Sequence, residues 1–565
     1  MNDTNPVESP ISHKVIFGLL LAVFFFVPLI YTPDNFLFAF GRQYYSKLIF
    51  TQIILTVICF FALIQFMVKG NLIYIRSKLL IPLILYFFCA FLSIFWSVSV
   101  FISIASFFEL ISYLLLCIIS MYFVNTDRKI RQVVLFWKLS MVGLVGVVLW
   151  QFMSGVECYG TIGNRNFLAA FVVLTVPVLF VSIKDAIIHK KHSESLLNIV
   201  LLIALGGVLF VTKSRGAFIA VLFVVFLYTE IQLLLHNKKI VALLIMLMGV
   251  LLAAFVCNSD FFISEIRADV RPYIWSGTLK MIAEHPFGGY GLGTFFIHFP
   301  FFRPVEYFLC PKYAQVSTHA LNEFLNIWIQ SGIFGLFFFI TYFVWMSCKM
   351  YGYIKRKGYI DLTGGIFLGV IGLFILSFID MHLMVPSIAI YFWMLTGIIM
   401  GKVIPVPSTT KWGMSLRVVL CTFIAVLLGV YVFYGVYKPL RAEVYFGQGM
   451  KARRVENWPL VVQNYEKGLQ YMPFRLDITY KCAYALSQTG NNDAAIHYYE
   501  YIKSFAPYYA RVDYNLAILY NAKGMGLEAK GSLLQWLALN PYDRDAKSLL
   551  NEMKEKWSDV AATQK

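Results

Sequence analysis

The sequence has few charged side chains for its length. Of its 565 residues only 14% are charged, while 59% are hydrophobic, and these include 53 Phe and 34 Tyr. A soluble globular domain cannot bury that much apolar surface, so the composition excludes one. The start of the chain also lacks the basic residues and small-residue cleavage site of a secretory signal, and the first apolar run, from Val15, is therefore expected to be a retained membrane span.

Patterns that bind metals or nucleotides are missing too. The nine cysteines show no CxxC or Cys/His spacing, and most lie inside apolar runs, so neither a metal site nor a cofactor is expected. Two of Cys158, Cys257 and Cys310 could form a disulfide if they face an oxidising compartment. The glycine-rich stretch "HPFGGYGLGTF" (residues 285–295) has no following Gly-Lys-Ser/Thr and no preceding strand, which excludes a Walker loop and a dinucleotide fingerprint.

What the sequence does contain is a series of apolar runs. Runs of about 20 residues, enough to cross about 30 Å of hydrocarbon, recur about thirteen times from Val15 to about Tyr434. The net charge is +17, but most cations lie in alternate short loops, which the positive-inside rule assigns to the cytoplasm. Topology therefore explains the basic balance, and no nucleic-acid partner is expected.

The sequence predicts an all-α, polytopic membrane protein in two parts. Residues 1–436 form a membrane domain of about thirteen transmembrane helices, with a long external loop at 258–320. Residues 437–565 form an external helical-repeat domain, because Pro473, Pro507 and Pro541 lie 34 residues apart, the tetratricopeptide period. Such repeats could bind a peptide, subunit or partner protein, or could pack as a cap that steadies the membrane domain.

The same topology places four polar segments on the external face, which in a two-membrane bacterium is the periplasm. They are "GTIGNRNFLAAF" after the fifth span, "TKSRGA" after the seventh, the loop 258–320, and "SFIDMHLMVP" after the eleventh. Nearly every unusual polar residue of the membrane domain therefore lies on one side.

Cations in these segments predict an anion site. Arg215 cannot lose its proton, so holding it at a membrane boundary requires an anion or a water-filled cavity; snorkelling to lipid headgroups is the alternative. Arg271 in "DVRPYIWSGT" and Arg165 in "GNRN" lie on the same face, beside Asn164 and Asn166. Together these groups could bind a diphosphate, whose oxygens match the guanidinium fork.

Two further stretches could complete the site. Gly289, Gly291 and Gly293 could turn backbone N–H groups toward an anion or let a large ligand approach, although a simple turn would also explain them. His319 and Glu323 are four residues apart, so a helix beginning by Thr318 would place both at its external end. His319 could then act as a general base that Glu323 orients; otherwise it is a polar boundary residue.

Taken in order, these motifs resemble a known family. "GNRNFLAAF", "TKSRGAF", "RPYIWSGTLKMIAEHPFGGYGLGTF", "HALNEFLNIWIQSGIFG" and "SFIDMHLMVP", within about residues 140–400, resemble the bacterial O-antigen ligase, O-antigen polymerase and protein O-oligosaccharyltransferase superfamily. The family's arginines correspond to Arg215 and Arg271, and its loop histidine is best matched by His319. Many members read "HN" where this chain has Leu321 and Asn322, so His319 is displaced by two residues from the family position.

The resemblance implies a GT-C-like glycosyltransferase in the bacterial inner membrane, with its active face and tail in the periplasm. It would move a glycan from undecaprenyl diphosphate to a hydroxyl acceptor, inverting the sugar carbon and using no metal and no cofactor. The expected catalytic residues are His319, Arg215 and Arg271. The expected substrate-binding residues are Asn164, Arg165, Asn166, Lys213, Gly289, Gly291, Gly293, Asn322, Glu323 and Asp380.

Several alternatives remain at this level. The acceptor is expected to be the lipid A core, as in an O-antigen ligase; a Ser or Thr of an exported protein, or another glycan chain, as in a polymerase, is the alternative. A lipid-linked sugar flippase should show a midplane cavity and inverted repeats, and no matching pair of broken helices is evident in the two halves. A non-catalytic scaffold would leave the cation cluster unexplained.

Overall fold

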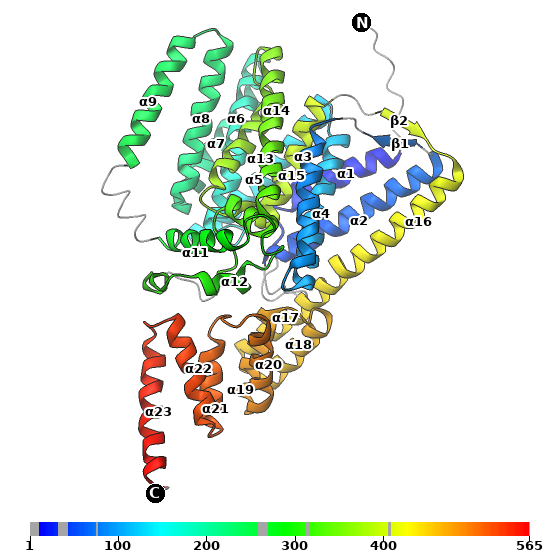
Figure 1. The fold of residues 1–565 in the computed structure, drawn as a ribbon. Coiled ribbons are helices and arrows are strands. Elements are labelled where there is room, and N and C mark those ends of the chain that lie inside the picture. Colours follow the sequence, from blue (N-terminus) through cyan, green and yellow to red (C-terminus); the bar gives the residue numbers. More distant parts are fainter. Residues whose placement is uncertain are drawn as a thin grey trace.

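The computed structural model describes residues 11–31, 43–69, 71–74, 77–257, 269–310, 317–404 and 408–563. Most of them form a bundle of long helices, and a smaller array of helices lies below the bundle in Figure 1. The bundle elements are α1 (Ile11–Phe26), α2 (Gln43–Lys69), α3 (Leu80–Leu92), η1 (Ser93–Trp96), α4 (Val100–Phe123), α5 (Asp127–Met153), α6 (Arg165–Ile188), α7 (His192–Thr212), α8 (Arg215–Leu235), α9 (Lys239–Cys257), α13 (Glu323–Lys357), α14 (Leu362–Leu376), η3 (His382–Met384), α15 (Pro386–Val403) and α16 (Met414–Tyr431).

The predicted all-helical, polytopic fold is confirmed. Among the described residues, nine helices are long and apolar enough to cross a membrane, and four shorter apolar helices accompany them, in line with the thirteen runs expected. One departure from the all-α prediction is a pair of four-residue strands, β1 (Asn71–Tyr74) and β2 (Ser408–Lys411), which pair antiparallel with Asn71 opposite Lys411.

The centre of the bundle is formed by helices whose glycines allow close approach. The apolar windows of α6 and α15 are 78% and 83% buried. A Cβ atom at Gly369 of α14 would lie 2.3 Å from the carbonyl oxygen of Leu174 in α6, and one at Gly397 of α15 would lie 2.2 Å from that of Cys117 in α4. Small residues at such contacts let transmembrane helices pack backbone to backbone. This tight core fixes the ends of α6, α14 and α15, where the polar segments begin.

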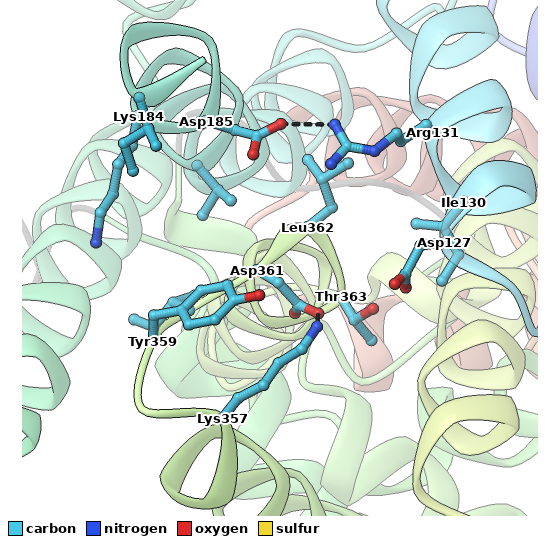
Figure 2. A pocket seen from close by; sticks show the side chains of 13 residues that line it. Asp127, Ile130, Arg131, Lys184, Asp185, Lys357, Tyr359, Asp361, Leu362 and Thr363 are labelled. Carbon is cyan, nitrogen blue, oxygen red and sulfur yellow. Dashed lines mark hydrogen bonds and ion pairs between the residues drawn. The ribbon is translucent and has the colours of Figure 1, made fainter. Parts of the chain in front are cut away.

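One end of the bundle carries residues that the positive-inside rule assigns to the cytoplasm. Arg131 near the start of α5, Lys184 near the end of α6 and Lys357 at the end of α13 line one pocket of about 110 Å³ (Figure 2). Nη1 of Arg131 pairs with Asp185 at 2.6 Å, and Nζ of Lys357 pairs with Asp361 at 2.5 Å. The structure therefore gathers these basic loops at a common end.

The other end carries the long loop and the tail. Here α11 (Arg271–Glu284), α12 (Phe295–Phe302) and η2 (Val305–Leu309) lie across the bundle, and we call this the α11 end (Figure 1). Of the predicted loop 258–320, residues 258–268 and 311–316 lie outside the described residues. The tail helices are α17 (Lys438–Arg454), α18 (Trp458–Tyr471), α19 (Leu476–Gln488), α20 (Asn492–Phe505), α21 (Val512–Ala522), α22 (Gly526–Leu539) and α23 (Arg544–Thr563).

The predicted boundary between residues 436 and 437 falls inside a continuous helical stretch, Met414–Arg454. Between α16 and α17 the helix widens into a π-helical turn, η4 (Val432–Tyr437). Pro439 follows this turn and has no N–H to donate to a carbonyl one turn earlier, which gives a reason for the change in hydrogen-bond spacing. The last membrane span therefore runs directly into the first tail helix.

The tail consists of neighbouring helices that pack in sequence order. Pro473, Pro507 and Pro541 lie in the turns after α18, α20 and α22, as the 34-residue spacing predicts. A Cβ atom at Gly449 would lie 2.3 Å from the ring of Tyr465, which is itself 0% exposed, so a small residue is required there. The helix-pair arrangement agrees with the repeat; its assignment to the tetratricopeptide class stays a prediction.

The predicted disulfide is not formed between the two cysteines that can be judged. Cys158 and Cys310 are both free thiols, and both are buried. The side chain of Cys257 lies outside the part of the chain that the structure describes.

Candidate functional site

The connection between α14 and α15 lies at the α11 end, where it meets the N-termini of four helices. α14 ends at Leu376, and α15 begins at Pro386, a residue suited to a first helical turn because it lacks an N–H. We call residues 377–383, which lie between these two helices, the 377–383 segment. The first residues of α6, α8, α11 and α13 all lie against it.

Asp380 is the central anion of this segment. Its side chain is buried, and its Oδ2 atom accepts hydrogen bonds from Nη2 of Arg271 and Nδ2 of Asn166, both long at 3.4 Å. Its Oδ1 atom accepts from the backbone N–H of Met381 at 2.9 Å. Both carboxylate oxygens are therefore engaged, and Asp380 links the starts of α6 and α11.

Arg271 is the first residue of α11 and is held from several directions. Its Nε donates to the carbonyl of Ile379 at 2.8 Å, and its Nη1 donates to Asp269 at 2.7 Å. Asp269 also accepts from the backbone N–H of Arg271, so the same carboxylate starts the helix and orients the side chain. The side chain remains 27% exposed, which leaves part of it open to a ligand.

Arg215 is the first residue of α8 and meets the same segment. The next residue, Gly216, packs against Ile379 so closely that a Cβ atom would lie 2.3 Å from its Cδ1 atom. The chain turns sharply before α8, because Lys213 adopts the left-handed conformation with φ 53°. Both Lys213 and Arg215 are exposed. The starts of α8 and α11, each with an arginine, therefore converge on Ile379.

The "GNRN" residues begin α6. Asn164 is the N-cap, and its side chain accepts the backbone N–H of Asn166 at 2.8 Å, which satisfies one of the free donors of the first turn. Arg165 is exposed. Asn166 is the member of this group that contacts Asp380, so the structure brings Asn166 to the cluster and gives Asn164 a local helix-capping contact.

The start of α13 is bound tightly to the 377–383 segment. Asn322 caps the helix through Oδ1 and donates from Nδ2 to the carbonyl of Phe378 at 2.8 Å. The backbone N–H of Glu323 donates to the carbonyl of Ser377 at 2.9 Å, and Oε2 of Glu323 accepts from the backbone N–H of Leu383 at 3.0 Å. Asn322 and Glu323 thus join the same cluster as Arg271 and Asp380.

The predicted helix start at Thr318 is wrong, and the expected pairing of His319 with Glu323 fails with it. α13 begins at Glu323, because Asn322 caps it and Leu321, with φ 48°, turns the chain away from a helical path. His319 lies in the preceding loop, where its Nδ1 and the hydroxyl of Thr318 are 2.8 Å apart. The two residues therefore do not share one helix face.

The glycine loop is packed into the protein. Gly289, Gly291 and Gly293 all have positive φ, and Cβ atoms there would lie 2.4 Å from the carbonyl oxygen of Ile329, 2.6 Å from Cβ of Ser97 and 2.3 Å from Oγ of Ser106. The glycines therefore permit close contact with α13, the η1–α4 connection and α4. Their described contacts do not reach the Arg271–Asp380 cluster, so the predicted anion cradle has no support from this geometry.

His382 is a residue of the site that sequence reasoning did not single out. It lies in the 377–383 segment, is 1% exposed, and packs edge-on against Phe167 with ring centroids 6.0 Å apart. Burial lowers the pKa of its ring to about 4; the charge of Asp380 opposes this shift and that of Arg271 adds to it. Its presence in "SFIDMHLMVP" was the only signal in the sequence.

Comparison with known families finds one match within the chain. Residues 199–340 match the family model of O-antigen ligase, a stretch that includes Arg215, Arg271 and the start of α13. A search of curated proteins finds no match to the chain. Members of the matched family are ligases and polymerases that act on glycans, so the match supports glycosyl transfer in general. The chain is therefore a polytopic membrane protein in which residues 199–340 are similar to the O-antigen ligase family.

Proposed function

We propose that the chain transfers a glycan from an undecaprenyl-diphosphate carrier to a hydroxyl acceptor at the α11 end of the bundle. The convergence on Ile379 of the start of α8, where Arg215 precedes the contacting Gly216, and of Arg271 at the start of α11 carries this proposal. Two permanently charged groups from separate helices are suited to bind one diphosphate. Asn166, Asn322 and Asp380 complete the polar surroundings of the pair.

In this reaction the arginines would provide the main stabilisation of the transition state. The acceptor oxygen forms a bond to the sugar C1 as the bond from C1 to the diphosphate oxygen breaks, and the diphosphate leaves with the electron pair. Negative charge grows on the leaving group in the transition state, so cations already fixed beside it stabilise that state more than the ground state. Attack from the face opposite the diphosphate inverts C1.

An O-antigen ligase activity, with the lipid A core as acceptor, is the form of this function that we propose first. The active face would then be periplasmic, in the inner membrane of a bacterium, and the tail would lie on the same side. The helical tail contacts α12 through Phe296 and Ile297, which supports a protein Ser or Thr as the second candidate acceptor.

Replacement of the arginines tests the proposal. In proteoliposomes with an undecaprenyl-diphosphate-linked glycan and lipid A core, Arg271→Ala and Arg215→Ala should each slow transfer by about 100-fold or more, as loss of an oxyanion donor does. Lys280→Ala removes an exposed cation from the same helix, α11, and should transfer at the wild-type rate. The measurement is product formed per enzyme in a single turnover with saturating donor.

Two results would contradict the proposal. Wild-type transfer by Arg271→Ala and Arg215→Ala would remove the arginines from the chemistry, and donor translocation without any covalent product would favour a flippase. Deletion of the gene, followed by comparison of the glycans on outer-membrane lipid and on secreted proteins, identifies the acceptor, because only the true acceptor loses its sugar.

A further inference from the structure

A polar face runs down α13 from the candidate site. Glu323, Asn326 and Gln330 are spaced by three and four residues, so they lie on the same side of the helix. All three are buried, at 2%, 0% and 5% exposure. Burying polar side chains costs free energy unless they are paired, so this buried polar face needs an explanation other than packing.

Several polar atoms around this face have no protein partner. Within the described part of the chain, no hydrogen bond reaches either side-chain polar atom of Asn326, the Nε2 atom of Gln330 or either ring nitrogen of His382, all of which are buried. His382 immediately precedes Leu383, whose N–H donates to Glu323, so the histidine lies next in sequence to the residue that contacts the start of the polar face. Buried polar groups are normally paired, and a cluster of unpaired ones is suited to a polar ligand.

The two buried carboxyl groups of the site differ in what they can still bind. Asp380 uses both oxygens, for Met381 on one side and for Arg271 and Asn166 on the other. Among the residues that the structure describes, Glu323 accepts a hydrogen bond through Oε2 alone, from Leu383, so its Oε1 keeps its lone pairs for another partner. A proton acceptor needs such an oxygen within hydrogen-bond reach of the attacking hydroxyl.

Building on the proposed function, we infer that Glu323 is the group that accepts the proton of the acceptor hydroxyl, and that Asn326 and His382 bind that hydroxyl beside it. As the hydroxyl oxygen bonds to the sugar C1, its proton passes to Oε1 of Glu323 while the diphosphate departs. The carboxyl later gives this proton to solvent or to the departing diphosphate, so atoms and charges balance. His319 then has no part in the proton transfer, which agrees with its place in the loop before α13.

The ligand in this inference is a hydroxyl, from either a sugar of a lipid core or a Ser or Thr side chain. The ionisable groups that interact with Glu323 are Asp380 and Tyr86, and Asp380 in turn interacts with His382 and binds Arg271. A drop in pH that protonates the carboxyl therefore removes the proton acceptor, and transfer should fall.

Glu323→Gln tests this role, because it keeps the size and removes the basic oxygen. Single-turnover transfer should fall by about 100-fold or more, the usual contribution of a general base, while binding of labelled donor stays within about twofold. The remaining rate should lose the acidic limb of the wild-type pH profile. Glu157→Gln, an exposed carboxyl in the loop before α6, serves as the matched control and should keep both rate and profile.

Two further variants keep the test decisive if Glu323→Gln is unstable in detergent. Glu323→Asp keeps the carboxylate but shortens the side chain by one methylene, so transfer should be about tenfold slower with the acidic limb of the pH profile preserved. Asn326→Leu should raise the KM for the acceptor more than it lowers kcat. Each is measured with lipid A core and with a Ser-containing peptide, and the acceptor that supports wild-type turnover identifies the source of the hydroxyl.

The outcomes separate this inference from the proposed function. Wild-type rates and pH profiles for both Glu323 variants, with Arg271→Ala still inactive, would overturn the role of Glu323 and leave glycan transfer intact. Failure of the wild-type protein to join donor and either acceptor would overturn the proposed function itself.

Discussion

Arg271 is ordered by two carboxyl groups before any substrate arrives. Asp269 and Asp380 hold its guanidinium through Nη1 and Nη2, and the carbonyl of Ile379 holds Nε. A side chain that is already fixed loses little conformational entropy when it binds a ligand, and it does not have to reorganise as charge develops. The surrounding anions also prevent an unpaired cation from lying at the membrane boundary.

At this residue scale, acid should destabilise the fold through His382. Burial lowers the pKa of the ring to about 4 from 6.5, so the folded protein keeps it neutral where the unfolded chain already binds a proton. Stability is therefore complete above pH 6.5 and falls as the pH drops from there toward 4, by about 3 kcal/mol for the full shift.

Thermal unfolding in detergent measures this effect. Between neutral pH and about pH 5, the melting temperature of His382→Phe should fall less than that of the wild-type protein, because the variant has no ring to protonate. Parallel curves for the two proteins would show that His382 does not contribute to the acid sensitivity.

At the scale of elements, the membrane-spanning helices could be predicted from the sequence, but the residues at which they begin and end could not. Hydrocarbon thickness requires long apolar runs, so composition alone locates the membrane helices. The start of α13 depends on Asn322, which caps the helix through Oδ1 and is held in place by the bond from its Nδ2 to Phe378, 56 residues away in sequence. Nothing in "STHAL" prevents an earlier start. The glycines of the loop were also ambiguous, because an anion-binding turn and a close packing contact both require positive φ.

Gly332 illustrates this dependence on tertiary contact. It interrupts α13 with φ 72° and ψ 179°, and a Cβ atom there would lie 1.7 Å from the carbonyl oxygen of Phe287 in the glycine loop. The backbone hydrogen bond from Ile333 to Pro286 holds the two segments together. The break in α13 therefore allows the glycine loop to pack directly against the helix backbone.

Gly332→Ala should consequently destabilise the protein by about 3 kcal/mol, from backbone strain and from displacement of the loop. Gly352→Ala is the control: this glycine lies in the same helix, and a Cβ atom added there would meet no other atom within 4 Å, so alanine should be neutral or slightly stabilising. Thermal unfolding of both variants measures the difference, and equal melting temperatures would contradict the close contact.

At the scale of the whole molecule, α12 lies between the bundle and the tail. Ile297 belongs to the apolar core of the tail, Phe296 packs on Tyr509 with ring centroids 5.9 Å apart, and Phe308 packs on Trp536 at 6.3 Å. The loop that carries Arg271 is therefore held from both sides. Of the two roles considered for the repeats, these contacts favour a cap that steadies the membrane domain. The contacting residues are too distant in sequence for a local sequence pattern to have predicted these contacts.

The stack of Phe101 on Phe474 offers a test of this cap, since it joins α4 to the tail with centroids 3.9 Å apart and planes at 4°. Phe474→Ala should weaken the tail's attachment by about 1 kcal/mol and reduce glycan transfer several-fold, because the loop beneath it loses support. Limited proteolysis should release the tail faster. Phe505→Ala, on the exposed side of α20, should change neither readout.

The continuous helix from α16 through the π-helical turn into α17 has a geometric consequence. Each residue of an α-helix rotates the chain by about 100° around the helix axis. The number of residues in this connection therefore sets the orientation of the tail around that axis. Adding or removing a single residue between Tyr437 and Lys438 would swing the repeats around the helix axis and away from α12, whereas a flexible linker would absorb the same change. The length of the α16–α17 connection thus determines how the tail is oriented relative to α12.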